Sequence, residues 1–187
     1  MWSEVKKAND VIESGGIILY PTDTIWGIGC DALNEKAITR IYALKNRADS
    51  KSLIILLAEP KDIFQFVANP HPDIISIVQS FERPTTVIYN QAIGLPDSLI
   101  SQDGSIAIRI TRDPFCKSLL KKMKKPLVST SANISGNPSP KEFSTIESAI
   151  KNGVDYIVSH RQDEKTNVPS SRIVRIHEDG SLDIIRE

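Results

Sequence analysis

The sequence predicts an α/β fold in which a twisted, mixed β-sheet is flanked by helices. Short β-rich runs alternate with stretches of helical periodicity, and two strand-like runs follow one another near the C-terminus. Because the alternation is not strict, a mixed sheet is favoured over a purely parallel one. No internal repeat or low-complexity linker interrupts the 187 residues. This length suits one domain that covers residues 1–187.

Strands are predicted where short apolar or β-branched runs are bounded by proline, glycine or polar residues. The first of these runs, residues 16–20, is stopped by Pro21, and the last two are close enough to form a hairpin. The predicted strands are residues 16–20, 53–57, 85–89, 105–110, 127–129, 155–159, 172–176 and 181–185.

Helices are predicted from apolar residues that recur at helical spacing and from residues suited to helix ends. Asn34 can cap a helix that carries Ile38 and Ile41 on its apolar face. Asp113 and Pro114 open a second helix. Further helices are expected in residues 60–68, in residues 73–81 and within residues 139–152.

The composition is that of a globular protein without a global charge. Apolar residues make up 40% of the chain, which is enough for a packed core. Lysine plus arginine and aspartate plus glutamate both total 23, so no overall basic field attracts nucleic acid, and any basic site must be local. The longest apolar run, residues 53–58, is too short to span a bilayer. With no signal-like N-terminus, a cytoplasmic protein is expected.

Cysteine and histidine usage gives no sign of a metal site. Cys30 and Cys116 lie far apart in the sequence without a CxxC pattern, which is typical of reduced thiols. His71, His160 and His177 are scattered and no pair has ligand spacing. A structural zinc site is therefore not expected.

The first candidate ligand site is the turn after the strand at 16–20, which carries Thr22, Asp23 and Thr24. Hydroxyls at a strand end can hydrogen-bond a small polar ligand, and the nearby Gly27 allows close backbone approach. The alternative is a turn whose side chains satisfy only their own backbone. No Walker lysine follows, so the segment is not a P-loop.

The second candidate is a group of three cations, Lys45, Arg47 and Lys51, between a predicted helix end and a buried strand. Triphosphate binding requires such groups, since arginine provides a forked contact and lysine a point charge. The alternative is a favourable interaction of these cations with the helix C-terminal dipole.

The third candidate is the polar segment that follows the strand at 127–129. Alternation along an extended chain places Ser129, Ser131 and Asn133 on one face. A buried strand with so many polar groups needs partners for them, and a ligand is one such partner. The alternative is an ordinary serine- and asparagine-rich loop.

Isolated residues complete the set of candidates. Arg109 ends an apolar strand, where it either reaches solvent or holds a carboxylate. The hydroxyl pair Ser170 and Ser171 and the C-terminal Arg186 are further candidates.

Taken together and in this order, these segments resemble the YrdC/YciO family. YPTDTIWGIGCDA is similar to the family's opening motif and KNRADSKSL to its lysine–arginine segment. RPTTVIY, SIAIRI, STSANISGNPSP, PSSRIV and IIRE are similar to later motifs, so the resemblance covers about residues 14–187. The chain departs from the family at Ala48 and Ser52, where prolines are usual, and at Leu56, where some relatives have histidine.

The resemblance implies a concave α/β domain that binds ATP and threonine side by side. It implies catalytic roles for Lys45, Arg47, Ser131 and Asn133. The residues implied to bind ATP are Arg47, Lys51, Ser105, Ser131, Ser139 and Arg186. The residues implied to bind threonine are Thr22, Arg109, Ser129 and Ser170.

The resemblance also implies a reaction. L-threonylcarbamoyladenylate synthases of this family form threonylcarbamoyl-AMP and pyrophosphate from threonine, bicarbonate and ATP. Mg²⁺ is expected on the triphosphate rather than in a metal site of the protein. Partner proteins are expected to transfer the threonylcarbamoyl group to an adenosine of tRNA.

An RNA-binding YciO-like paralogue without synthase activity is the alternative. The lysine-rich run at 117–125 offers a local surface for weak binding of tRNA or double-stranded RNA. The simpler interpretation of that run is a solvated helix face. Salt-dependent RNA affinity without ATP consumption would favour the paralogue.

Overall fold

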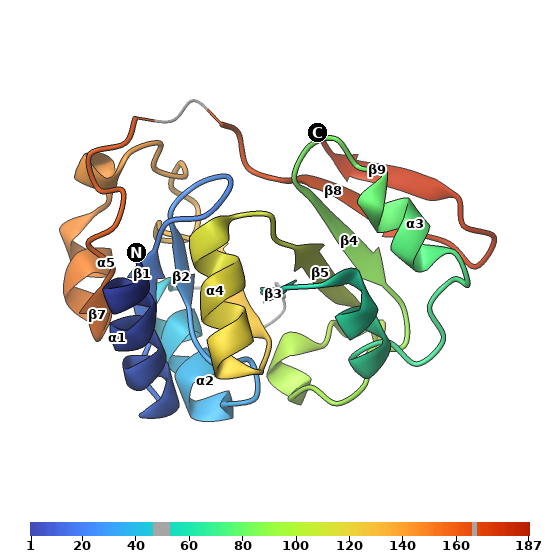
Figure 1. The fold of residues 1–187 in the computed structure, drawn as a ribbon, viewed down its shortest axis with the longest axis horizontal. Coiled ribbons are helices and arrows are strands. Elements are labelled where there is room, and N and C mark those ends of the chain that lie inside the picture. Colours follow the sequence, from blue (N-terminus) through green and yellow to red (C-terminus); the bar gives the residue numbers. More distant parts are fainter. Residues whose placement is uncertain (47–52, 166–167) are drawn as a thin grey trace.

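A computed structural model describes residues 1–46, 53–165 and 168–187 of the chain. Within these ranges, nine strands form one sheet in the order β7-β1-β2-β6-β3-β5-β4-β8-β9 (Figure 1). The strands are β1 (Ile18–Tyr20), β2 (Gly27–Gly29), β3 (Ile54–Leu57), β4 (Thr85–Tyr89), β5 (Ile106–Ile110), β6 (Leu127–Ser131), β7 (Tyr156–Ile157), β8 (Arg172–Ile176) and β9 (Leu182–Arg186).

The sheet is mixed, as predicted. Strand β1 pairs with β7, β3 with β5 and β4 with β8 in parallel. The other neighbouring strands are antiparallel, including the C-terminal hairpin of β8 and β9. The mixed α/β fold predicted from the sequence is therefore confirmed.

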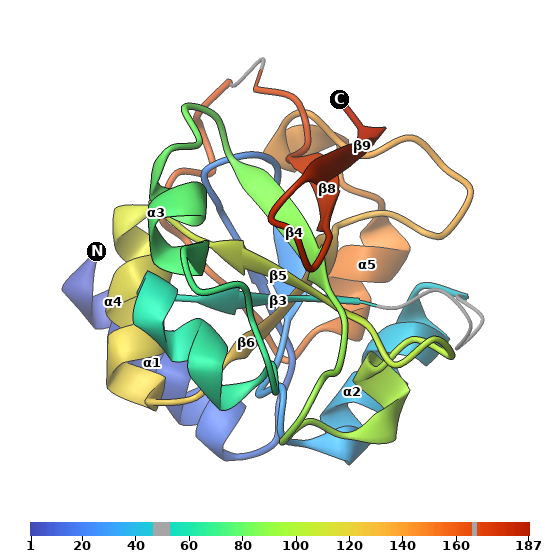
Figure 2. The same ribbon diagram turned by 90° about the vertical axis from the view of Figure 1, so that its right-hand side faces the viewer.

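Helices cover both faces of the sheet. The α-helices are α1 (Trp2–Glu13), α2 (Glu35–Leu44), α3 (Ile74–Gln79), α4 (Pro114–Met123) and α5 (Ser148–Gly153). Helices α1 and α4 pack together over Ile18 and Leu56, whereas α2 and α5 belong to the core that contains Leu19 and Ile55. Successive strand residues point to opposite faces, so the two helix pairs lie on opposite sides. Figure 2 shows β3, β5 and β6 between these layers.

The two predicted helix caps are present. The side chain of Asn34 accepts a hydrogen bond of 3.1 Å from the backbone N–H of Ala37 at the start of α2. The side chain of Asp113 accepts one of 2.8 Å from the N–H of Cys116 at the start of α4. Each cap satisfies a backbone donor that the first helical turn leaves unpaired.

The structure differs from the sequence prediction at several elements, which include an unpredicted 3₁₀ helix at Asp97–Leu99. The helix expected at 60–68 is a 3₁₀ helix at Pro60–Gln65, and α1 and β2 were not predicted. The apolar face of α1 is narrow, and β2 is a three-residue strand with glycine at both ends. Glycine normally argues against a strand, so only the tertiary packing explains β2. In the described part of the chain, no helix is long and apolar enough to cross a membrane.

Gly29 in β2 is required by its neighbours rather than by its backbone conformation. A Cβ atom at this position would lie 2.3 Å from the carbonyl oxygen of Val128 and 2.8 Å from the Tyr20 ring. The phenol of Tyr20 crosses this space to donate a hydrogen bond of 3.2 Å to the same carbonyl. The absence of a side chain therefore lets β1, β2 and β6 pack closely.

Replacing Gly29 with alanine should destabilise the fold. We expect Gly29→Ala to lower the free energy of unfolding by about 2 kcal/mol, because the methyl group overlaps backbone as well as a ring. Urea unfolding followed by circular dichroism measures this change. Gly27→Ala is the matched control, because its Cβ meets its nearest atoms at an ordinary 3.4 Å. Equal stability of the two variants would contradict the packing argument.

A buried carboxylate ties α1 to the segment after β7. Glu4 accepts hydrogen bonds from the Tyr156 hydroxyl at 2.7 Å and from the Ser159 N–H at 2.8 Å. Burial of the carboxylate opposes its ionisation, but these hydrogen bonds outweigh burial and lower the pKa of Glu4 from 4.5 to about 2.

Stability should therefore fall in acid through Glu4. A carboxyl group whose pKa is lower in the folded state stabilises the protein fully above pH 4.5 and ceases to do so as the pH falls toward 2. We expect Glu4→Gln to destabilise the protein at pH 7 and to flatten the dependence of its stability on pH between these values. Urea unfolding at a series of pH values tests this, and parallel curves for the two proteins would contradict it.

Candidate functional site

A cavity of about 200 Å³ lies at the centre of the sheet. It brings together six residues to which the family resemblance gave ligand roles, contributed by β5, β6, the segment after β6, and the C-terminal segment. These six are Arg109, Ser129, Ser131, Ser139, Ser170 and Arg186. Segments separated by most of the chain therefore share one polar cavity.

The strand register explains why Arg109 and Arg186 meet. Arg109 of β5 lies opposite Thr86 of β4, and Thr86 lies opposite Ile173 of β8. Ile173 in turn lies opposite Arg186 of β9. Directly opposed residues point to the same face of a sheet. This row therefore places two arginines on one face, three strands apart.

A β-bulge aims Arg186 into this row. Val174 pairs with Ile184, and a regular ladder would then pair Ile173 with Ile185. The register shifts between Ile173 and Val174, so that Arg186 takes the place opposite Ile173. Bulges re-aim side chains in this way.

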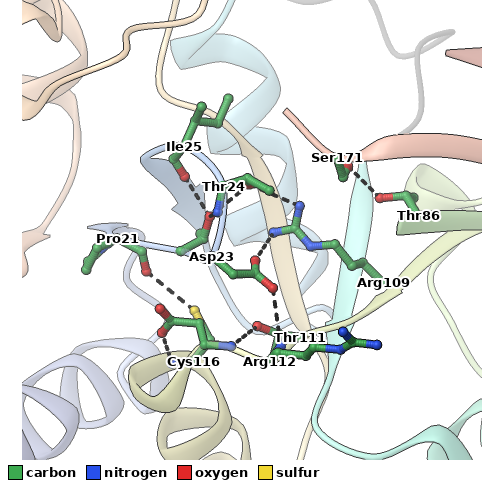
Figure 3. Close-up of polar contacts among 12 residues, drawn as sticks. Pro21, Asp23, Thr24, Ile25, Thr86, Arg109, Thr111, Arg112, Cys116 and Ser171 are labelled. Carbon is green, nitrogen blue, oxygen red and sulfur yellow. Dashed lines mark hydrogen bonds and ion pairs between the residues drawn. The ribbon is translucent and has the colours of Figure 1, made fainter. Parts of the chain in front are cut away.

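Arg109 is a buried residue, at 3% exposure, and its side chain has two neighbours from the turn between β1 and β2. Its Nη1 donates a hydrogen bond of 3.2 Å to the Thr24 hydroxyl, and its Nη2 lies 3.3 Å from Oδ1 of Asp23 (Figure 3). Its Nε is buried and has no hydrogen-bond partner among the described residues. A guanidinium has five N–H donors, so donors remain for a ligand.

A hydroxyl chain fixes the orientation of Thr24. The Thr22 hydroxyl donates to the carbonyl of Ile25 at 2.7 Å and lies 3.0 Å from the Thr24 hydroxyl. Because the hydroxyl proton of Thr22 is donated to the Ile25 carbonyl, the Thr24 hydroxyl must donate to the Thr22 oxygen. The lone pairs of the Thr24 oxygen then face Arg109. Thr22, the predicted threonine ligand, therefore lies behind Thr24, which is the residue that lines the cavity.

Arg186 adds a second cation to the cavity. Its Nη2 donates a hydrogen bond of 2.7 Å to the backbone carbonyl of Ser171. Partial burial and the positive charge of Arg109 both lower the pKa of Arg186. Mutual repulsion between two guanidiniums is relieved when an anion binds between them, so the cavity favours an anionic ligand.

A family model identifies the family to which the chain belongs. The Sua5/YciO/YrdC model, described as "Telomere recombination", matches residues 10–187. The chain belongs to the Sua5/YciO/YrdC family.

Relatives and structures within this family are similar over most of the chain. A threonylcarbamoyl-AMP synthase of Stutzerimonas stutzeri is 33% identical over 82% of this chain and 83% of its own length. The crystal structure of P. abyssi Sua5 complexed with L-threonine has a TM-score of 0.83 and 23% identity, over 92% of this chain and 50% of that one. E. coli YciO has a TM-score of 0.84 and 19% identity, over 100% of this chain and 90% of that one.

Lys45, at the family's lysine–arginine motif, is almost completely buried, at 1% exposure. Its ammonium donates hydrogen bonds to the backbone carbonyls of Ser131 at 2.5 Å and Asn133 at 2.6 Å. The backbone N–H of Ser135 in turn donates to the carbonyl of Lys45 at 2.8 Å. The structure thus places Lys45 beneath the loop after β6, where it holds the serine that lines the cavity.

Asn133, the other half of the family motif, closes the same loop. Its amide donates to the carbonyls of Ile134 at 2.9 Å and Asn137 at 2.7 Å, which fixes the assignment of its nitrogen and oxygen. Its Oδ1 is buried and has no hydrogen-bond partner within the described residues. A buried acceptor of this kind needs a partner, and a ligand is one such partner.

Two of the predicted ligands that the structure describes, Thr22 and Ser105, do not line the cavity. Ser105 donates to Asp103 at 2.6 Å, within the turn that precedes β5. Arg47 and Lys51 lie outside the described residues. In the part of the chain that is described, no cluster of three or more histidine, cysteine, aspartate or glutamate side chains is arranged to hold a metal ion.

Sequence reasoning missed Thr86, whose hydroxyl lines the cavity and hydrogen-bonds to that of Ser171 at 2.9 Å (Figure 3). Thr24 and Ser171 were candidates from the sequence, and both line the cavity, although the family resemblance gave them no ligand role. Thr86 could not be singled out from the sequence, because a threonine in a strand is ordinary.

Removing the Lys45 ammonium should destabilise the loop that it holds. We expect Lys45→Met to lower the free energy of unfolding by about 3 kcal/mol, because two buried carbonyls lose a charged donor. Urea unfolding measures the change. Lys36→Met, at an exposed position of α2, is the control and should change stability by less than about 0.5 kcal/mol. A loss of similar size in both variants would contradict this role of Lys45.

Proposed function

We propose that this chain is a threonylcarbamoyl-AMP synthase, which forms threonylcarbamoyl-AMP and pyrophosphate from L-threonine, bicarbonate and ATP. The observation that carries the proposal is the cavity in which Arg109 and Arg186 lie beside several hydroxyls. The names of the curated relatives, at 33% and 32% identity, support it. The related Sua5 structure with L-threonine supports an amino acid as one ligand.

Threonine is assigned to the part of the cavity around Arg109. Arg109 would bind its carboxylate, because its remaining N–H donors form a fork suited to two oxygens. The hydroxyls of Thr24 and Ser129 are the polar groups beside it. In the related Sua5, L-threonine is the ligand named, which agrees with a site of this size and charge.

ATP is assigned to the part of the cavity around Arg186. Arg186, Ser131 and Ser139 line it and would contact the phosphates, together with Arg47 and Lys51. Mg²⁺ would arrive on the triphosphate and neutralise part of its charge. Ser105 and Asn133 remain proposed contacts of ATP and of the catalytic loop.

The chemistry needs positioning and charge more than acid–base groups. The threonine amine and bicarbonate combine to N-carboxythreonine with loss of water. An oxygen of the new carboxylate then attacks the α-phosphorus, its bond to the bridging oxygen breaks, and pyrophosphate leaves. Two anions must approach each other, so fixed guanidiniums on either side lower the barrier. The transfer of AMP makes the enzyme a nucleotidyltransferase.

The product is an activated donor for tRNA modification. Partner proteins would transfer its threonylcarbamoyl group to an adenosine of tRNA in the cytoplasm. The alternative, an RNA-binding paralogue, rests on the lysines of α4 and the residues after it. Two of these, Lys117 and Lys121, lie 3.5 Å and 3.3 Å from the Glu59 carboxylate, which reduces the charge available for RNA.

Purified protein incubated with threonine, bicarbonate, ATP and Mg²⁺ should yield threonylcarbamoyl-AMP, detected by mass. We expect Arg109→Gln to lower kcat/KM for threonine by about 100-fold, because a buried charged contact to the carboxylate is lost. Arg175→Gln is the matched control, since Arg175 lies on β8 and pairs with Asp103 away from the cavity. Absence of product from the wild-type protein would overturn the proposed function.

A further inference from the structure

We propose that Asp23 is a positioning residue that fixes the Arg109 guanidinium for the carboxylate of threonine. The inference rests on the proposed function, because it assigns the amino-acid ligand to Arg109. It gives a role to an acidic side chain beside a site that otherwise selects anions.

Asp23 connects two points of the same strand end. Its Oδ1 lies 3.3 Å from Nη2 of Arg109, and its Oδ2 accepts a hydrogen bond of 3.2 Å from the backbone N–H of Arg112 (Figure 3). The side chains of Asp23 and Arg109 are 13% and 4% exposed, so water weakens their attraction little. The backbone contact holds the carboxylate, and the carboxylate holds the guanidinium.

Two contacts on different nitrogens define the guanidinium plane. Asp23 holds Nη2, while the Thr24 hydroxyl holds Nη1 at 3.2 Å. Both anchors come from the same turn, although the arginine follows 85 residues later. Rotation about the last side-chain bonds of Arg109 would break one contact or the other. The arginine is thus oriented before a ligand arrives, which lowers the entropy lost on binding.

Asp23 attracts the Arg109 guanidinium without occupying all of its N–H donors. Oδ1 of Asp23 makes no hydrogen bond with any described residue, although it lies within ion-pair distance of Nη2. Nε of Arg109 is likewise without a hydrogen-bond partner in the described ranges. An offset pair leaves N–H donors for the carboxylate of a ligand, whereas a bidentate pair would occupy them.

The hydrogen bond from the backbone N–H of Arg112 requires an acceptor oxygen at position 23 but not a negative charge. An asparagine at this position still has an oxygen that can accept from the N–H of Arg112. Asp23→Asn therefore keeps the turn in place and removes only the attraction on Nη2. Asp31→Asn is the matched control, because Asp31 is also a buried carboxylate that accepts from a backbone N–H and pairs with a cation, Lys125 at 2.6 Å.

The experiment measures binding of L-threonine and of ATP to the purified chain by calorimetry. We expect Asp23→Asn to raise the Kd for threonine about 10-fold and to leave the Kd for ATP within about twofold. Asp31→Asn should change neither. In an Arg109→Lys background, which lacks the fork, adding Asp23→Asn should change the threonine Kd by less than about twofold, since coupled residues are not additive.

The outcomes separate this inference from the function on which it rests. An unchanged threonine Kd in Asp23→Asn overturns the inference, as does an equal loss of ATP affinity, which would indicate general damage. Equal effects of Asp23→Asn with Arg109 and with Lys at position 109 also overturn it. If the wild-type chain binds threonine but forms no adenylate, the proposed function fails while the positioning role is still measured by binding. If it binds no threonine, both fail.

Discussion

The structure depends on one costly group, the Arg109 guanidinium buried in the middle of a β-sheet. A charge in this position must be compensated, or it would be expelled from the interior. Compensation comes from a turn 85 residues earlier, which supplies Thr24 and, beside it, Asp23. This requirement brings the β1–β2 turn against β5 and leaves between them a cavity whose charge is balanced only in part. The excess positive charge that destabilises the site also makes it selective for anions.

Much of the fold could be predicted from local patterns. β4 and β8 occupy the predicted ranges 85–89 and 172–176, and the Asn34 and Asp113 caps are present. These features depend on neighbours in sequence, which periodicity and capping describe well. β2 depends instead on Tyr20 and Val128, which surround Gly29 in space. No local pattern contains that information.

The sequence predicted several residues of the candidate site, but it did not predict how they contact one another. Arg109, Ser129 and Ser131 were named from sequence and share the cavity. The residues that orient them were harder to find. Lys45 was expected to face phosphates, which stays a prediction, and the structure adds that its ammonium holds the carbonyls of Ser131 and Asn133 at the end of β6. A motif identifies which residue types are needed, but only the register and the packing decide which atoms meet.

The row that runs from Arg109 across Thr86 and Ile173 to Arg186 spans four strands. Its members are drawn from both halves of the chain, so no early, locally ordered fragment can contain the binding site. Ligand binding consequently requires contacts between segments that are far apart in the sequence. A ligand that binds only the native state would raise the free energy of unfolding by about 2.7 kcal/mol at a concentration of 100 times its Kd. In a cell, substrate supply would thus also set how long each molecule escapes proteolysis through its unfolded form.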